Sequence, residues 1–241
     1  MRFKVPESTS GMQAFDLHSH THYSNDAITL PENVLKFNRK QGYFGFAVTD
    51  HGKFDAWNYF KKEAKKFDLM FIPGVEWYVF KDEKPQGEII ALFLQEPLEK
   101  KHRDIWAFLD ECHAQDALLI APHPFEKHRK GLKCLQEKEV LKKIHATEGI
   151  NSRAYFWKYN LTAQKFLEQH PELTASAGSD AHTPWELGNA AIYLNATNEE
   201  EFRKSFLKHQ TIIAGRRAPW SVHVWTQLAK RNLAKDKERE I

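Results

Sequence analysis

Short apolar runs alternate along this chain with longer stretches in which apolar and polar residues follow a helical period. The apolar runs predict strands, which we place at residues 14–18, 45–50, 71–79, 88–94, 117–122, 144–150, 174–179 and 190–194. The amphipathic stretches between them predict helices, at residues 31–42, 59–67, 103–115, 138–144, 154–170 and 198–210. Pro31 and Gly42 lie where the first turn and the C-cap of the first of these helices are expected.

Strands that alternate with helices indicate parallel pairing through right-handed crossovers. Seven or eight such units favour an α/β fold of the distorted (β/α)7 barrel type, with a doubly wound sheet as the rival. The sequence contains no clear linker and no internal repeat, so residues 1–241 are interpreted as a single domain. Residues 198–241 are expected to form a C-terminal helical extension packed on the barrel.

Composition narrows the class of protein. With 41% hydrophobic and 28% charged residues the chain is an ordinary globular sequence, and its net charge of +3 is too small to indicate a nucleic-acid partner. Two cysteines make a disulfide scaffold improbable, which favours a reducing, cytoplasmic location. We find neither a secretory apolar segment nor a run of roughly 20 apolar residues. No membrane association and no obligate protein partner are therefore expected.

Histidines and carboxylates follow most of the predicted strands. In barrels of this class, functional side chains come from the C-terminal ends of the strands. The residues near these ends, together with one that begins the fourth strand, are His18, His20, Asp26, His51, Glu76, Glu88, His123, Glu148, Asp180 and His182. Residues i and i+2 of a strand face the same side, so the H-x-H pair formed by His18 and His20 can reach one ion.

Each of these residues also has a simpler interpretation. A single histidine after a strand is more often structural or solvated, and Asp180 could cap a helix over residues 183–188. Their joint placement at one end favours a site for zinc, manganese or iron, the metals that suit mixed imidazole and carboxylate ligands. The remaining histidines scatter along the chain and are interpreted as structural or solvated; they include His102, His113, His145, His170, His209 and His223.

Six short motifs occur in the order and spacing of a known family. They are "DLHSHTHYSND", "VTDHG", "PGVEW", "APHPF", "EGIN" and "GSDAHTPWELG", and they extend over residues 16–188. On these motifs the chain resembles the polymerase-and-histidinol-phosphatase (PHP) family of metal-dependent phosphoesterases. The later "TIIAGRRAPWSVHVW" is similar to the C-terminal segment of one PHP subgroup. The resemblance implies a distorted seven-stranded (β/α) barrel that holds two or three divalent metal ions.

The resemblance also implies a ligand set for each ion. His18, His20, Glu76 and Asp180 would bind the first metal, and Glu76 would bridge to a second metal shared with His123. Asp26, His51 and His182 would bind the third; a shorter step seen in the family would select Asn25, but an anionic carboxylate is the better ligand. Asp180, His182 and the bridging Glu76 are the candidate catalytic residues.

Glu88 departs from the family pattern, because many members have a histidine at that position. As a ligand it would make the second site harder and more anionic, favouring manganese or magnesium over zinc. The alternative is that Glu88 points to solvent and leaves the second metal with too few ligands.

The expected reaction is hydrolysis of a phosphomonoester or phosphodiester by a metal-bound hydroxide. The substrate would be a nucleotide, a small phosphorylated metabolite or the end of an oligonucleotide. Arg153 follows the sixth strand, and Lys127, His128 and Arg129 follow "HPF". We expect Arg153, Arg129 and His128 to bind phosphate, since arginine matches phosphate bidentately; the alternative is a solvated basic loop.

Two other functions remain open from the sequence. An amidohydrolase-type metal hydrolase also opens with H-x-H on a barrel, but it would place a histidine after the sixth strand, where this chain has Glu148. A non-catalytic metal-binding PHP module would be expected to have lost ligands, whereas this chain keeps all but one of them.

Overall fold

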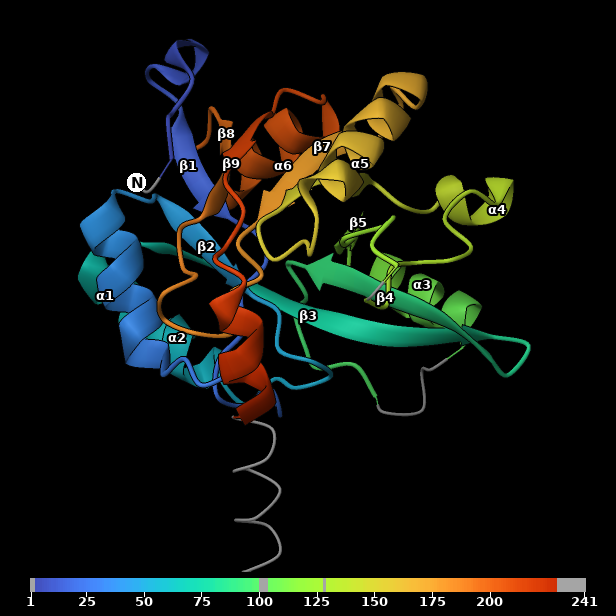
Figure 1. The fold of residues 1–241 in the computed structure, drawn as a ribbon, viewed down its shortest axis with the longest axis horizontal. Helices are drawn as coiled ribbons and strands as arrows, with labels where there is room; N and C mark the ends of the chain where they lie inside the picture. The colour runs from blue at the N-terminus through green and yellow to red at the C-terminus, as the bar shows by residue number, and fades with distance from the viewer. Residues whose placement is uncertain (1–2, 100–103, 128, 229–241) are drawn as a thin grey trace, which may run out of the picture.

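The computed structural model describes residues 3–99, 104–127 and 129–228. Nine strands in these residues form one sheet (Figure 1): β1 (Gln13–Asp16), β2 (Gly45–Val48), β3 (Met70–Lys81), β4 (Lys84–Leu92), β5 (Leu118–Ala121), β6 (Ala146–Asn151), β7 (Thr174–Gly178), β8 (Ala190–Leu194) and β9 (Ile212–Gly215). The sheet curls until it is nearly closed, which confirms the expected distorted α/β barrel.

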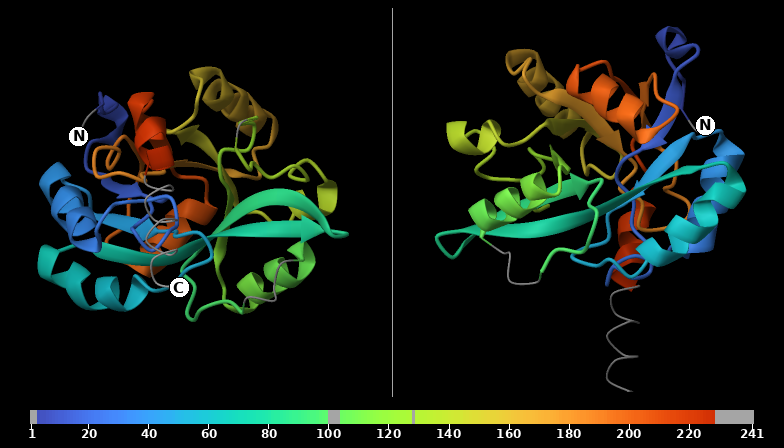
Figure 2. Two further views of the ribbon diagram at one scale, coloured as in Figure 1. Left: turned by 60° about the horizontal axis from the view of Figure 1, so that its bottom comes forward. Right: turned by 180° about the vertical axis from the view of Figure 1, so that it is seen from behind.

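Helices lie on the outside of this curved sheet (Figure 2). They are α1 (Pro31–Gln41), α2 (Trp57–Glu63), α3 (Ile105–Ala114), α4 (Lys138–Leu141), α5 (Trp157–Gln169) and α6 (Glu199–Leu207), with short 3₁₀ helices η1 (Glu7–Thr9) and η2 (Ala64–Phe67) and a further helical segment at 221–228. Helix α1 begins at Pro31 and is capped at its C-terminus by Gly42, which adopts the left-handed conformation (φ 74°), as the sequence predicts.

Alternate residues of β4 pack on opposite faces of the sheet. Ile89 belongs to the core cluster that includes Phe108 of α3. Ile90 belongs to a second cluster, which includes Phe15 of β1 and Phe202 of α6. This alternation is what a strand buried on both faces requires, and it accounts for the continuous apolar run in the sequence.

The sheet is mixed, which corrects the expectation of parallel pairing throughout. Its order is β7-β6-β5-β4-β3-β2-β1-β8-β9, and β4 is antiparallel to both β3 and β5. Only Asp82 and Glu83 separate β3 from β4, and both have positive φ (51° and 60°) as tight hairpin turns require. A parallel crossover needs a dozen or more residues, so this short connection forces antiparallel pairing.

The barrel closes between the ends of β1 and β7. Ser19 pairs in parallel with Ala181, and the backbone N–H of Asp180 donates to the carbonyl of His18 (2.7 Å). Gly178 allows this close approach, because a Cβ there would lie 2.2 Å from the Cβ of His18. The closure therefore brings the segments that follow β1 and β7 together.

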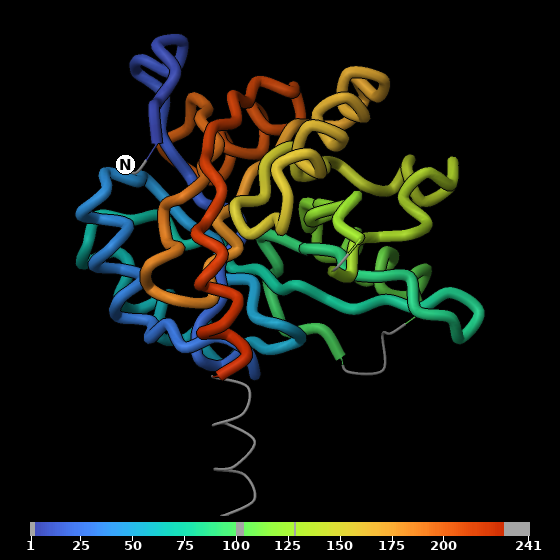
Figure 3. Tube along the Cα trace, viewed as in Figure 1, coloured from blue at the N-terminus to red at the C-terminus, as the bar shows by residue number. Residues whose placement is uncertain are grey.

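The C-terminal extension is not entirely helical, contrary to the expectation for residues 198–241. After α6 the chain forms β9, which pairs antiparallel with β8, and only then the helical segment 221–228. The apolar residues of β9 complete the edge next to β8. Figure 3 traces the chain beyond β9 alongside the loop between β7 and β8, where the backbone N–H of Arg216 donates to the carbonyl of Asn189 (2.8 Å). Residues 229–241 lie outside the described part.

His145 has the structural role that the sequence suggests for a scattered histidine. Its Nδ1 accepts a hydrogen bond from the backbone N–H of Leu119 (2.9 Å), which ties the start of β6 to β5. Burial, followed by the nearby His113, lowers the pKa of His145 to about 4. The folded state therefore holds the neutral ring.

This pKa predicts a loss of stability on acidification. Unfolded chains bind a proton at His145 below about pH 6.5, whereas the folded protein resists it down to about pH 4. Between pH 7 and 5 the wild type should lose about 2 kcal/mol more unfolding free energy than His145→Asn, which retains an acceptor. Urea titrations at both pH values measure this difference. His170→Asn, on the surface beside Glu172, is the control; parallel pH profiles for wild type and His145→Asn would contradict the assignment.

Candidate metal centre

The side chains expected to bind metal all lie at one end of the barrel. Most of them follow a strand or lie near its C-terminal end. The exception is Glu88, which lies in the first half of the antiparallel strand β4. They are His18, His20 and Asp26 after β1, His51 after β2, Glu76 in β3, Glu88 in β4, His123 after β5, and Asp180 and His182 after β7. Glu88 joins them because β4 is antiparallel, so that its first half lies at the same end as the C-terminal ends of its neighbours.

Four sets of three side chains offer ligand atoms within 4.8 Å of one another. These sets are His18–His20–Asp180, His18–Glu76–His123, His51–Glu76–Glu88 and His20–His51–His182. Every member is buried except His51, which is partly exposed. The sets share members, so they form one continuous cluster.

Glu76 lies at the centre of this cluster. Its Oε1 contacts Nε2 of His123 at 3.0 Å. Its Oε2 lies 3.0 Å from Nδ1 of His51, 3.4 Å from Nε2 of His20 and 3.5 Å from Nε2 of His18. The two carboxylate oxygens therefore face different imidazoles, which is the arrangement that a bridging ligand needs.

The two oxygens of Asp180 also divide between different neighbours. Oδ1 lies 3.5 Å from Nε2 of both His18 and His20. Oδ2 accepts hydrogen bonds from Asn151 (2.9 Å) and from Arg129. Asp180 thus directs one oxygen to the histidines and keeps the other in a fixed polar contact.

Asp180 does not cap a helix. Residues 184–188 form a turn, and Glu186 accepts hydrogen bonds from the backbone N–H and the hydroxyl of Thr183 (both 2.9 Å). Asp180 itself has φ 52°, and His123 has φ 32°. Backbone in this region is unfavourable for residues with a Cβ, and it clusters at functional sites.

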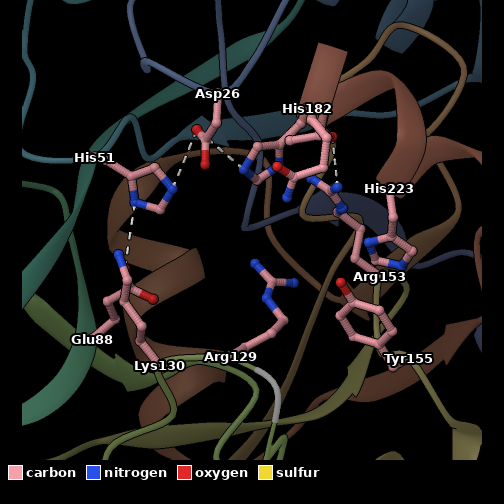
Figure 4. A pocket seen from close by; sticks show the side chains of 11 residues that line it. Asp26, His51, Glu88, Arg129, Lys130, Arg153, Tyr155, His182 and His223 are labelled. Carbon is pink, nitrogen blue, oxygen red and sulfur yellow. Dashed lines mark hydrogen bonds and ion pairs between the residues drawn. The ribbon is translucent and has the colours of Figure 1, made fainter. Parts of the chain in front are cut away.

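A third group of potential ligands lies beside this centre (Figure 4). Oδ1 of Asp26 is 3.6 Å from Nε2 of His51 and 3.5 Å from Nε2 of His182. Asn25, the alternative considered from the sequence, is exposed. The geometry therefore brings Asp26 to the cluster and leaves Asn25 outside it.

Glu88 points into the cluster and not to solvent. The residue is 4% exposed, and its carboxylate oxygens lie 3.7 Å from Nδ1 of His51 and 3.8 Å from Nε2 of His123. Lys130 approaches Glu88 from the pocket side at 3.4 Å. The interpretation in which Glu88 is solvated is therefore wrong.

The charges of the cluster fit a group of cations. Burial opposes ionisation of Glu76 and Asp180. His18 nevertheless holds the carboxyl pKa of Glu76 well below the usual range, and Arg129, followed by His18, does the same for Asp180. Burial also opposes charge on His20, but the adjacent carboxylates of Asp180 and Glu76 raise the pKa of His20 to about 9. Oε2 of Glu76 and Oδ1 of Asp180 are buried and accept no hydrogen bond from any described residue. Anionic oxygens buried in this way, among imidazoles, are suited to divalent metal ions.

The model of the PHP domain family matches residues 16–217. This chain belongs to the PHP domain family. An uncharacterized protein of Methanocaldococcus jannaschii is 34% identical over 191 residues, which is 77% of this chain and 72% of that protein. DNA polymerase III PolC-type of Thermotoga maritima is 36% identical over 87 residues, covering 34% of this chain and 6% of the polymerase.

Solved structures share the PHP fold at low sequence identity. A two-domain protein of Bacteroides vulgatus, described as containing a predicted PHP-like metal-dependent phosphoesterase, has a TM-score of 0.72 and 19% identity, covering 88% of this chain and 68% of its own. An amidohydrolase of Chromobacterium violaceum with bound sulfate has a TM-score of 0.59 and 15% identity, covering 82% and 97%. No helix in the described residues of this PHP domain is long and apolar enough to cross a bilayer.

Two polar residues contact the PHP cluster from outside it. The sequence placed Glu148 at a strand end but assigned it no role, and it did not select Asp50. Glu148 of β6 contacts Nδ1 of His18 (2.9 Å) and accepts from the backbone N–H of His123 (2.8 Å). Asp50 accepts hydrogen bonds from the hydroxyls of Thr21 (2.6 Å) and Ser24 (2.8 Å). The sequence shows that both residues lie near strand ends, but only the structure shows which side chains their carboxylate oxygens contact.

Glu148 should control how tightly the first metal binds. A carboxylate on the distal nitrogen of a ligating histidine fixes the ring orientation, and its loss typically reduces metal affinity 10- to 100-fold. We expect Glu148→Gln to weaken metal binding in this range while leaving a folded barrel. Titration of the metal-free protein with Zn²⁺ measures the effect. Glu168→Gln, a substitution in α5, is the control, and equal affinities in the two variants would rule out the role.

The basic residues occupy the same pocket as the third group. Arg129, Lys130 and Arg153 line it together with Asp26 and His182. His128 lies outside the described residues. Arg129 contacts Asp180, so its guanidinium is tied to the cluster as well as to the pocket. The interpretation of these arginines as a solvated basic loop is wrong for Arg129 and Arg153, since both point inward.

One histidine that was interpreted from the sequence as structural or solvated lies in the pocket. His223 comes from the helical segment 221–228 and lines the pocket beside Tyr155. Among the other scattered histidines, His170 pairs with Glu172 and His209 contacts Thr174, both away from the site; His102 lies outside the described residues. The sequence motif that contains His223 carried no signal for the pocket.

Proposed function

We propose that this PHP-domain protein is a metal-dependent phosphoesterase that hydrolyses a phosphomonoester or phosphodiester. The substrate class is a nucleotide, a small phosphorylated metabolite or the end of an oligonucleotide. The observation that carries the proposal is the adjacency of two oppositely charged sets: the buried His and carboxylate cluster, and the guanidinium groups of Arg129 and Arg153 in the pocket beside it. Metal ions and arginines are the two groups that proteins use to hold phosphate.

The contacts support a ligand set for each of two or three divalent ions. The first ion would be held by His18, His20, Glu76 and Asp180. Nε2 of each histidine lies within 3.5 Å of a carboxylate oxygen of both Glu76 and Asp180. Glu76 would be shared with a second ion, together with His123 and Glu88. Asp26, His51 and His182 would hold the third. Zinc, manganese or iron suits the first and third sites, and the added carboxylate of Glu88 also admits magnesium at the second.

Different residues of the chain would bind the phosphate and transfer protons. When bound, ions of this kind acidify a coordinated water and neutralise phosphate oxygens. Arg153 would bind phosphate oxygens from the pocket side, held in place by Glu186 at 3.0 Å. Asp180 and His182 would hold or move a proton, and His182 Nδ1 contacts the carbonyl of Asp180 at 2.9 Å.

Metal analysis together with two generic substrates tests this function. We expect purified protein to carry two or three transition-metal ions per chain and to hydrolyse p-nitrophenyl phosphate, bis(p-nitrophenyl) phosphate or both. Chelation should remove the activity, and added Mn²⁺ or Zn²⁺ should restore it. A protein that is metal-free and binds neither added ion would overturn the assignment. If the enzyme is active, a panel of nucleotides, sugar phosphates and short oligonucleotides would define its substrate.

The amidohydrolase alternative makes a different demand on the sixth strand. That class needs a metal-ligating histidine there, whereas Glu148 of β6 contacts the side of His18 that faces away from Glu76 and Asp180. Hydrolysis of amide substrates without phosphoesterase activity would favour this alternative. A fully metal-loaded protein without turnover on either class would favour a non-catalytic PHP module.

A further inference from the structure

The helical segment 221–228 is bound to the loop that follows β6. The backbone N–H of Ala218, just before the segment, donates to the carbonyl of Ser152 (2.7 Å). Within the segment, the hydroxyl of Thr226 accepts a hydrogen bond from Nη2 of Arg153 (2.8 Å). The loop that carries the proposed phosphate-binding arginine is therefore fixed by the C-terminal helix.

One face of this helix forms a wall of the pocket. Val222 and Thr226, one turn apart, are 3% and 6% exposed and face the barrel. Val224 and Trp225 on the other side are 45% and 49% exposed. His223 lies next to the buried face, and Figure 4 shows its ring directed into the pocket near Arg153.

Stacking fixes the ring of His223. The imidazole lies nearly parallel to the ring of Tyr155, with centroids 4.2 Å apart and an angle of 11° between the planes. Tyr155 is itself held by Arg217, which donates to its carbonyl (2.9 Å). A stack of this kind occupies the face of the imidazole and leaves both ring nitrogens at its edge. Neither nitrogen hydrogen-bonds to another residue in the described ranges.

We propose that His223 is a further substrate-binding residue, which donates a hydrogen bond to a phosphate oxygen held by Arg153. This inference rests on the proposed function of the same site. It extends the phosphate-binding set beyond the barrel loops to the C-terminal helix, so that the pocket is complete only when this helix is docked.

The electrostatics of the pocket agree with a donor role. Burial, followed by the charges of Arg153 and Arg129, lowers the pKa of His223 to about 4. The neutral ring that results carries one N–H donor and avoids repulsion from the two guanidinium groups. A bound phosphate would place anionic oxygens between these groups. Because the ring of His223 is already held in place, its N–H can bind such an oxygen with little further loss of conformational entropy.

Binding of inorganic phosphate to the metal-loaded, full-length protein tests the proposal without relying on turnover. The variants are His223→Ala and His223→Gln, which retains an N–H donor, with Val224→Ala on the exposed face of the same helix as the control. We expect His223→Ala to raise the Kd for phosphate roughly 10- to 100-fold, as for a lost hydrogen bond to a charged group. His223→Gln should recover part of the affinity, and Val224→Ala should match the wild type.

Metal content and thermal unfolding, measured on the same samples, separate loss of a contact from loss of the site. Equal phosphate affinity in wild type and His223→Ala would overturn the inference, as would a wild type that binds no phosphate. Loss of affinity in Val224→Ala as large as that in His223→Ala would also overturn it, since it would assign the effect to helix docking alone. A wild type that binds phosphate through His223 but hydrolyses no phosphoester would leave this inference standing and reject the proposed function.

Discussion

Replacing Glu76 by glutamine should abolish most of the activity of this PHP domain and leave it short of metal. Oε2 of Glu76 lies within 3.5 Å of three imidazoles, and Oε1 contacts a fourth, on His123. Glutamine has nearly the same volume but carries no charge, and its amide nitrogen is a poor ligand. Because one carboxylate serves two proposed sites, its loss should weaken both. Several kcal/mol of transition-state stabilisation correspond to a fall in turnover of about a thousandfold.

Elemental analysis and turnover, measured on the same sample, check this prediction. Glu172→Gln is a matched control, because Glu172 also pairs with a histidine (2.9 Å to His170) but on the surface. The control should keep its metal and its rate. Full metal loading with normal turnover in Glu76→Gln would show that the Glu76 carboxylate neither binds metal nor takes part in the reaction.

The helices and most strands could be predicted because their signals are local. Pro31 and Gly42 mark the ends of α1 in the sequence as they do in the structure. The direction of pairing is not local. The antiparallel course of β4 follows from the two-residue turn at Asp82 and Glu83, which lacks the glycine that would have marked it. Strand β9 was missed for a similar reason, since its four residues form a strand only by pairing with β8.

The candidate ligands could be predicted from the sequence because strands of a barrel bring their ends to one place. The residues that hold these ligands in position could not be predicted in this way. Glu148 and Glu76 look alike in the sequence, since each is a glutamate near a strand end. In the structure Glu148 contacts Nδ1 of His18, whereas Glu76 faces Nε2 of the same ring. The role of His223 is harder still to predict from the sequence. It depends on contact between the helical segment 221–228 and the loop of Tyr155, which are more than sixty residues apart in the sequence.

Asp180 and His182 lie two residues apart, and their losses should differ in kind. Asp180→Asn preserves the size of the side chain and tolerates the positive φ of 52°, which alanine would not. It removes the charge from Oδ1, the oxygen that faces His18 and His20. We expect the first metal to bind poorly and turnover to fall about a thousandfold or more. His182→Ala instead removes one neutral ligand from the group of Asp26 and His51.

The His182→Ala variant should therefore keep the ions of the first two sites, and high metal concentration should restore part of its rate. A site that lacks one ligand is weakened and not abolished, whereas extra metal cannot replace the charge lost in Asp180→Asn. Metal stoichiometry and turnover, each measured at low and high Mn²⁺, separate the two cases. If Asp180 serves only to balance Arg129, Asp180→Asn will retain all of its metal, and the assignment of this carboxylate to the first ion must then be abandoned.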